Sequence, residues 1–150
     1  MRSTIAVALL SAWIGAAILL SASVAPAAFA ALPSRTMAGD VVGRVLPVIF
    51  LSGIGVTLVS LLLIAPHDWP RRIAGAGVIV ACAMAQFYIA PRIARLRDEI
   101  GGPVDALAAD SPQRMLFGRL HGMSVAWMGA GVLAAVILVV LSLRALRARS

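Results

Sequence analysis

Five polar side chains stand where long apolar segments of the chain give way to charged ones. They are His121, Gln86, Ser124, Asp40 and Arg44. Two of them, His121 and Ser124, are three residues apart and would share one face of a helix. An imidazole, an amide, a hydroxyl, a carboxylate and a guanidinium can together bind a polar ligand through hydrogen bonds and charge. We therefore treat the five as a candidate binding site, to be tested by whether the fold brings them together.

Other chemistry has few residues to support it. The chain contains two histidines, His67 and His121, and a single cysteine, Cys82. No nucleophile stands in a recognisable pattern with a base, and no glycine-rich phosphate loop is present. We therefore expect no enzyme, no bound metal and no cofactor. A soft copper(I) site built from one histidine, Cys82 and methionines is the alternative that these residue types leave open.

Four long apolar segments must position these side chains. Each is close to the ~20 residues that an α-helix needs to cross a bilayer. They contain no Asp, Glu, Lys or Arg, in keeping with a cost of at least ~2.5 kcal/mol for a charge at mid-bilayer. We predict an all-α, four-helix transmembrane bundle forming one domain over residues 1–150. The predicted spans are residues 4–24, 47–65, 73–90 and 123–143.

Two of the predicted helices extend beyond the bilayer. Ser34 can cap a helix that begins near Arg35, where Asp40 and Arg44 stand in the favourable i,i+4 order. The segment 91–100 alternates apolar and charged residues at helical spacing and continues the third helix out of the membrane. Gly101 follows this segment and ends it. Asp110 or Ser111 can cap the last helix.

Three prolines are expected to shape the helices. Pro26 marks the end of the first helix, Pro91 marks the point that the third span reaches, and Pro47 kinks or breaks the second. Pro26 and Pro91 both follow an alanine, 65 residues apart, and Gly-Arg pairs begin at Gly43 and Gly118. This pattern predicts a duplicated helical hairpin in which both copies run the same way. Coincidence between alanine-rich helices is the alternative interpretation.

The N-terminal segment has features of a secretory signal peptide. Arg2 precedes an apolar run, and Ala28-Phe29-Ala30 has the form of a cleavage site. The run is longer than the usual ~7–15 residues of a signal core, and it carries small residues at helical spacing. We therefore expect it to be retained as the first span. Arginines are nearly equal in number on the two sides, and Arg2 favours cytoplasmic termini.

The net charge of +7 comes entirely from arginines that flank apolar spans, so we expect the bilayer and no nucleic acid as a partner. Glycines at GxxxG spacing begin the second and fourth helices, as Gly39-xxx-Gly43 and Gly118-xxx-Gly122. Such glycines can form the contact face of a homo-oligomer. Close packing within one bundle is the interpretation that we favour.

Short motifs at two places resemble a known family. They are the segment from Ala25 to Pro33 with the later Gly43-Arg44-Val45-Leu46, and Leu120-His121-Gly122-Met123-Ser124. Together they are similar to the transmembrane protein 205-like family, whose bacterial four-helix members have no assigned function. The resemblance implies a four-helix integral membrane protein with no established activity. We expect it in the bacterial inner (plasma) membrane. The resemblance supplies no catalytic residues to carry over.

Three function classes follow for a protein of this kind. We expect first a non-catalytic binding or assembly module of the membrane. A small transporter or channel subunit that acts as an oligomer is the alternative, and a metal- or cofactor-handling protein centred on His121 is the third. The five polar residues serve a ligand in one interpretation and hydrogen-bond between helices in the other, at about 0.6 kcal/mol per contact.

Overall fold

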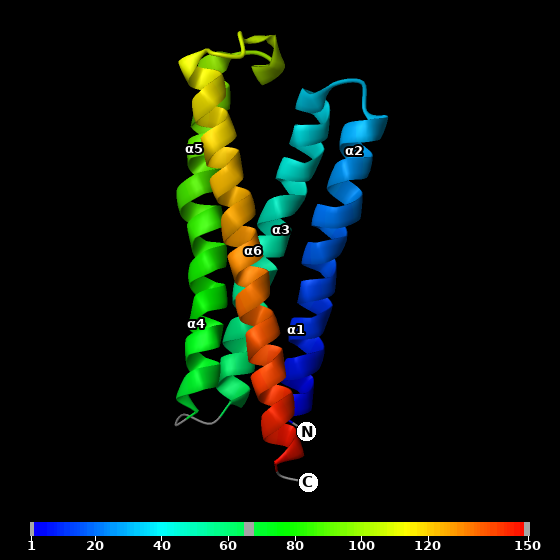
Figure 1. Cartoon of the computed structure of the whole chain (residues 1–150), viewed down its shortest axis with the longest axis vertical. Helices are drawn as coiled ribbons and strands as arrows, with labels where there is room; N and C mark the ends of the chain where they lie inside the picture. The colour runs from blue at the N-terminus through cyan, green and yellow to red at the C-terminus, as the bar shows by residue number, and fades with distance from the viewer. Residues whose placement is uncertain (1, 65–67, 149–150) are drawn as a thin grey trace.

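Four long helical rods run alternately up and down in the computed structural model, which describes residues 2–64 and 68–148 (Figure 1). Over those residues the chain is helical with no strand, as the sequence predicts. His67 lies outside the described residues. The elements are α1 (Arg2–Leu19), η1 (Leu20–Val24), α2 (Ala25–Ala31), α3 (Arg35–Leu63), α4 (Trp69–Ala83), η2 (Met84–Ile89), α5 (Ala90–Ile100), η3 (Val104–Ala106) and α6 (Pro112–Arg147).

The four rods are long and apolar enough to cross a membrane, which confirms the predicted four-helix architecture. They cover Ser3–Ala31, Arg35–Leu63, Trp69–Ile100 and Pro112–Arg147. The shortest has 29 residues, about 43 Å at 1.5 Å per residue, whereas a hydrocarbon core is ~30 Å thick. The rods therefore extend past the apolar segments at their ends. All four meet at the end that holds the chain termini, shown at the bottom of Figure 1.

Two of the prolines do not end their helices. The first rod continues through Pro26 to Ala31, so the predicted end of the first helix near Pro26 is wrong. The third rod likewise continues through Pro91 to Ile100, as the pattern of residues 91–100 predicts. Each proline follows a wider π-helical segment, η1 or η2. A proline has no N–H and crowds the preceding turn, and a wider turn accommodates both effects.

The two π-helical segments stand at matching places in the two hairpins. The N–H of Ala25 donates to the carbonyl of Leu20, and the N–H of Ala90 donates to the carbonyl of Ala85, each across five residues. The Ala-Pro sequence thus follows the same local structure at both places, in the first rod and in the third. Pro47, in contrast, lies inside α3 without a break in that helix.

Two side-chain caps and one glycine fix three helix ends as predicted. The hydroxyl of Ser34 accepts a hydrogen bond from the Met37 N–H at 3.1 Å, and that of Ser111 accepts one from the Arg114 N–H at 3.3 Å. Gly101 ends α5 with φ = 64°, a left-handed conformation that glycine adopts without steric cost.

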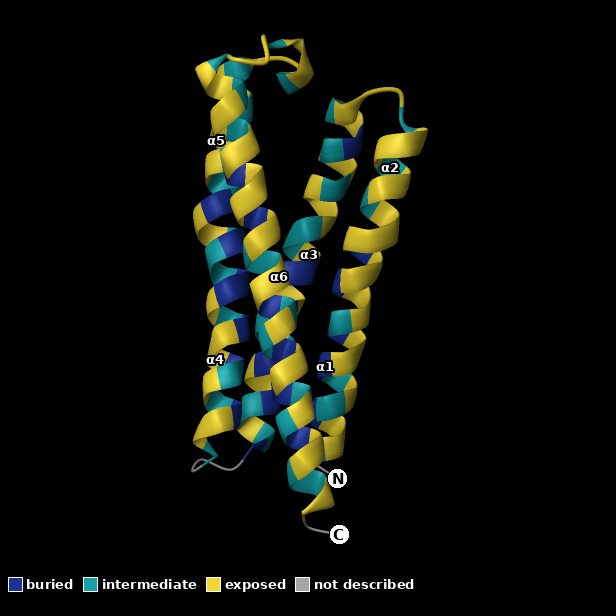
Figure 2. Ribbon diagram, viewed as in Figure 1, coloured by how far each residue is buried: buried dark blue, intermediate teal, exposed yellow. Residues whose placement is uncertain are grey.

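Most buried residues lie in the middle and lower parts of the bundle (Figure 2), and a smaller buried cluster joins Ile89, Leu96 and Leu120 of η2, α5 and α6. The Trp13 indole packs on Gly53, and its Nε1–H donates to the carbonyl of Ile49 at 2.8 Å. Phe50 and Cys82 are buried in one cluster with Trp13. Above this cluster α2 packs on α3, and α5 packs on α6. The two pairs separate toward the end away from the termini, as Figure 1 shows.

Candidate ligand-binding pocket

A cavity of about 450 Å³ lies between the two separated helix pairs, above the central core. One wall is α3, with Asp40 and Arg44 near the mouth and Phe50 at the floor. Asp40 and Phe50 are ten residues apart, so the wall is about 15 Å deep along the helix axis. The opposite wall consists of η2 and α5, and α6 contributes Ser124.

Four of the five residues that the sequence singled out line this cavity. They are Asp40, Arg44, Gln86 and Ser124, which come from α3, η2 and α6. Residues separated by more than eighty positions in the chain thus face one space. The side chain of Ser124 is 8 % exposed, so it belongs to the inner part of the wall.

His121 is not among the lining residues. Its side chain is exposed on α6, and its ring stacks on that of Phe117 with centroids 6.3 Å apart and an interplanar angle of 6°. Although His121 and Ser124 are three residues apart, Ser124 is buried while His121 is exposed. The rotation of α6 about its axis therefore separates the imidazole from the other four side chains.

The mouth of the cavity carries a cross-helix ion pair that the sequence did not suggest. Arg97 Nη1 of α5 donates to Asp40 Oδ1 of α3 at 2.7 Å. The expected i,i+4 pair of Asp40 with Arg44 is not formed. Within residues 2–64 and 68–148 no ion pair or hydrogen bond engages Arg44, whose side chain lines the cavity.

The position of Arg97 is fixed by several neighbours. Its guanidinium carbon lies 5.8 Å from the centroid of the Phe117 ring, within the range of a cation–π contact. Its Nη2 would lie 2.9 Å from a Cβ at Gly39, so a glycine there leaves room for the arginine. The sequence predicted only that Arg97 lies in the charged helical segment 91–100. Its partner Asp40 is 57 residues away, and no local spacing indicates it.

The deeper wall contains a polar atom without a partner. Gln86 Oε1 is buried, and no described atom donates a hydrogen bond to it. Gln86 belongs to η2, the π-helical segment before Pro91, and such segments are frequent at functional sites. A buried carbonyl oxygen without a donor costs about 1–3 kcal/mol. Because this oxygen has almost no accessible surface, the cost belongs to the packing of η2 and not to a contact open to an occupant of the cavity.

Apolar side chains make up the rest of the lining. Phe50 is 1 % exposed and belongs to the central core, so it closes the floor. Leu46, Pro47 and Ile93 contribute apolar surface between the floor and the charged mouth. The cavity is thus charged at its opening and apolar at its base, with one amide and one hydroxyl along the walls.

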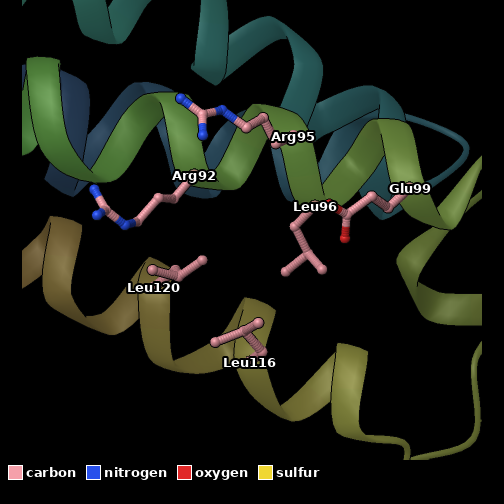
Figure 3. Close-up of a pocket in the computed structure, with 6 residues that line it drawn as sticks. All are labelled: Arg92, Arg95, Leu96, Glu99, Leu116 and Leu120. Carbon is pink, nitrogen blue, oxygen red and sulfur yellow. The ribbon is translucent and has the colours of Figure 1, made fainter.

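A second, shallower groove of about 300 Å³ runs between α5 and α6. Figure 3 shows Leu116 and Leu120 pointing from α6 toward α5. Two arginines, Arg92 and Arg95, line it. Arg92 is already engaged, because its Nη1 donates to the Tyr88 carbonyl at 2.7 Å and its guanidinium stacks on the Tyr88 ring. The groove also carries a carboxylate, Glu99, and none of the five predicted residues lines it.

Metal-binding groups do not gather in the part of the chain that the structure describes, which has no group of three or more His, Cys, Asp or Glu side chains. Cys82 is buried in the central core, where its Sγ would lie 3.8 Å from a Cβ placed at Gly131. The thiol and the exposed His121 imidazole thus occupy different environments in the fold.

The amino-acid sequence was also compared with known proteins. No curated protein and no solved structure matches it. A model of the domain of unknown function DUF4149 matches residues 8–101, which is most of the first three helical rods. That match includes α3, η2 and α5, the elements that build most of the cavity, and it ends before α6. The chain therefore belongs to the DUF4149 family, an uncharacterised family.

Proposed function

We propose that this protein is a non-catalytic membrane module that binds a small molecule in the cavity between α3 and the α5–α6 pair. The observation that carries the proposal is the convergence of Asp40, Arg44, Gln86 and Ser124 on one cavity. Arg44, Gln86 and Ser124 make no hydrogen bond to a neighbouring helix within the described residues, and this supports a ligand over interhelical bonding for these three. Asp40 instead pairs with Arg97 of α5.

The size and polarity of the cavity agree with this function. Small-molecule sites usually have volumes of about 300–1,000 Å³ and combine apolar walls with a few polar groups. The cavity falls within that range, at about 450 Å³. Its floor at Phe50 lies within the apolar segment of α3, and its mouth at Asp40 and Arg44 lies outside it. In a bilayer such a cavity would open at the headgroup level.

Filling the cavity tests the proposal. Gly43 lines it, and a Cβ added there would meet no atom within 4 Å, so Gly43→Phe places a ring in the cavity without a backbone clash. Gly55→Phe is the matched control, because Gly55 is in the same helix, also has open space and lies away from the cavity. Native mass spectrometry of protein extracted gently from its host membrane reports retained ligands.

We expect the unmodified protein and Gly55→Phe to retain the same non-covalent small molecule, and Gly43→Phe to lose it. Retention by all three proteins would place the ligand elsewhere and contradict the proposal. Absence of any retained small molecule from the unmodified protein would also contradict it. Circular dichroism of the three proteins checks that the helical fold is intact in each case.

An oligomeric transporter or channel subunit is a second candidate. Gly118 and Gly122 are exposed on α6, and a Cβ at either would meet no atom within 4 Å. This pair is therefore free of the close intramolecular packing that Gly53 and Gly75 show. Gly118→Leu with Gly122→Leu should lower the oligomer order in the same mass spectra if this face joins copies of the chain. If the double variant has the same oligomer mass as the unmodified protein, or if the unmodified protein is a monomer, this face does not join copies of the chain.

We also propose a kinship with the transmembrane protein 205-like family, a location in a bacterial inner membrane and cytoplasmic termini. The four apolar helices indicate a membrane location, and the motifs around Pro26 and His121 support the kinship. Single cysteines at Ala109 and Ala148, in a Cys82→Ala background, test the orientation. Only the Ala109→Cys protein should react with an impermeant maleimide added outside the cell; labelling of Ala148→Cys instead would reverse the orientation.

A further inference from the structure

The charge at the mouth of the cavity identifies the class of ligand. Two guanidiniums, of Arg44 and Arg97, and one carboxylate, of Asp40, line that end. Asp40 neutralises Arg97 through their 2.7 Å contact, and Arg44 is left without a counterion in the described structure. The mouth therefore carries one unit of positive charge that no described side chain balances.

The rest of the cavity defines the shape of the ligand. Arg44 and Phe50 are six residues apart on α3, so the floor lies about 9 Å below the Arg44 backbone along the helix axis. Between them Leu46, Pro47 and Ile93 supply apolar surface. A free inorganic anion would leave this apolar surface uncovered, whereas an apolar chain would pack against it.

We infer that the ligand is an anionic amphiphile, with a carboxylate or phosphate head at Arg44 and Arg97 and an apolar tail that extends to Phe50. The inference rests on the proposed function, because it names the ligand of the same cavity. Guanidinium groups bind carboxylate and phosphate through paired, charge-assisted hydrogen bonds. A neutral or cationic amphiphile would leave Arg44 without such a partner.

The groove between α5 and α6 is a less suitable site for an anionic amphiphile. Arg92 is held by the Tyr88 ring and carbonyl, and Glu99 places a carboxylate at the end of the groove. Figure 3 shows that the two arginines of the groove, Arg92 and Arg95, do not converge on a common point. The cavity at Arg44 therefore remains the preferred site.

Calorimetric titration of the protein in phosphatidylcholine nanodiscs tests the inference, with empty nanodiscs as the reference for partitioning. The probes share one tail length: dodecanoate, dodecyl phosphate, 1-dodecanol and dodecyltrimethylammonium. Acetate and inorganic phosphate represent the heads without a tail. We expect at least one of the two anionic amphiphiles to bind about tenfold more tightly than dodecanol, the lower end of what a charged hydrogen bond contributes. The stronger of the two anions then identifies the head.

Substitutions at the two charged positions, Arg44 and Asp40, should change the affinity for the anionic amphiphile in opposite directions. Arg44→Gln should weaken the anionic amphiphile about tenfold. Asp40→Asn should strengthen it by about twofold to fivefold, because it releases Arg97 from a partly exposed ion pair. Arg119→Gln is the matched control, since Arg119 is exposed on α6 outside the cavity and its loss changes the net charge equally.

The outcomes separate this inference from the proposed function. Equal affinities for dodecanoate, dodecyl phosphate and dodecanol, or equal effects of Arg44→Gln and Arg119→Gln, would overturn the anionic head. So would binding of the tail-less anions as tightly as the amphiphiles, or no binding of any probe. The proposed function is tested separately, by whether the unmodified protein retains a small molecule and whether Gly43→Phe loses it. A retained neutral molecule that Gly43→Phe removes would keep the function and reject the ligand class.

Discussion

Replacement of Gly53 by alanine is expected to destabilise the bundle, although alanine is the better helix former. A Cβ at this position would lie 2.7 Å from Cε2 and Cζ2 of the Trp13 indole and 2.8 Å from its Nε1. The indole cannot withdraw freely, because it is 5 % exposed and its Nε1–H is bonded to the Ile49 carbonyl. The added methyl group must therefore displace a packed side chain or separate α1 from α3.

The magnitude follows from a comparison with Gly55. Overpacking of a filled core costs about 1–3 kcal/mol, and the gain in helix propensity from glycine to alanine is up to ~1 kcal/mol. Gly55 lies two residues further along α3, and a Cβ there would meet no atom within 4 Å. The propensity gain is common to both variants and cancels. We therefore expect Gly53→Ala to be less stable than Gly55→Ala by about 1–3 kcal/mol.

Unfolding by sodium dodecyl sulfate in mixed micelles, followed by circular dichroism, measures this difference. A second variant identifies its cause. Trp13→Ala removes every indole atom near the added Cβ, so in that background Gly53→Ala should cost little stability. Equal stabilities of Gly53→Ala and Gly55→Ala would refute the packing of Trp13 on Gly53. Independent effects of Trp13→Ala and Gly53→Ala would refute it as well.

Two further predictions concern the end of the bundle away from the termini. The Asp40–Arg97 pair is partly exposed, so its contribution to the free energy of unfolding should be small. A double-mutant cycle with Asp40→Asn and Arg97→Gln should give a coupling energy of only ~0.2–1 kcal/mol. A coupling energy of zero at low salt would contradict the ion pair. Gly101→Ala should cost ~1 kcal/mol in the same unfolding assay because φ is 64° there. Gly102→Ala, whose φ is not positive, should be nearly neutral, and equal losses would contradict the left-handed end of α5.

Helix boundaries set by local chemistry were predictable from the sequence. Ser34, Ser111 and Gly101 occupy the positions that their side chains, or lack of one, favour in any helix. The end of the first helix was not predictable in this way. An Ala-Pro pair is compatible with a helix end and with a π-helical turn, and packing of α2 against α3 accompanies the second outcome here.

The candidate site was predictable in part. Asp40, Arg44, Gln86 and Ser124 stand near the ends of apolar segments, and antiparallel helices of similar length bring such ends together. The presence of Arg97 in the cavity lining and the absence of His121 from it were not predictable. Both depend on the rotation of a helix about its own axis, and a rotation of 100° per residue turns neighbouring positions to different surroundings.

The sequence by itself determined the architecture of this protein. The free energy of transfer from water to an apolar medium is a property of each side chain, and these free energies add along a segment. Four segments without charged residues therefore suffice to predict four apolar helices. Only the tertiary structure decided which side chains share a cavity. The choice of Arg97 over Arg44 as the partner of Asp40 depends on how far the α2–α3 and α5–α6 pairs separate. The arrangement of the two pairs depends on contacts between residues distant in the chain, such as those of Trp13, Phe50 and Cys82 in the central core, and no local pattern records them.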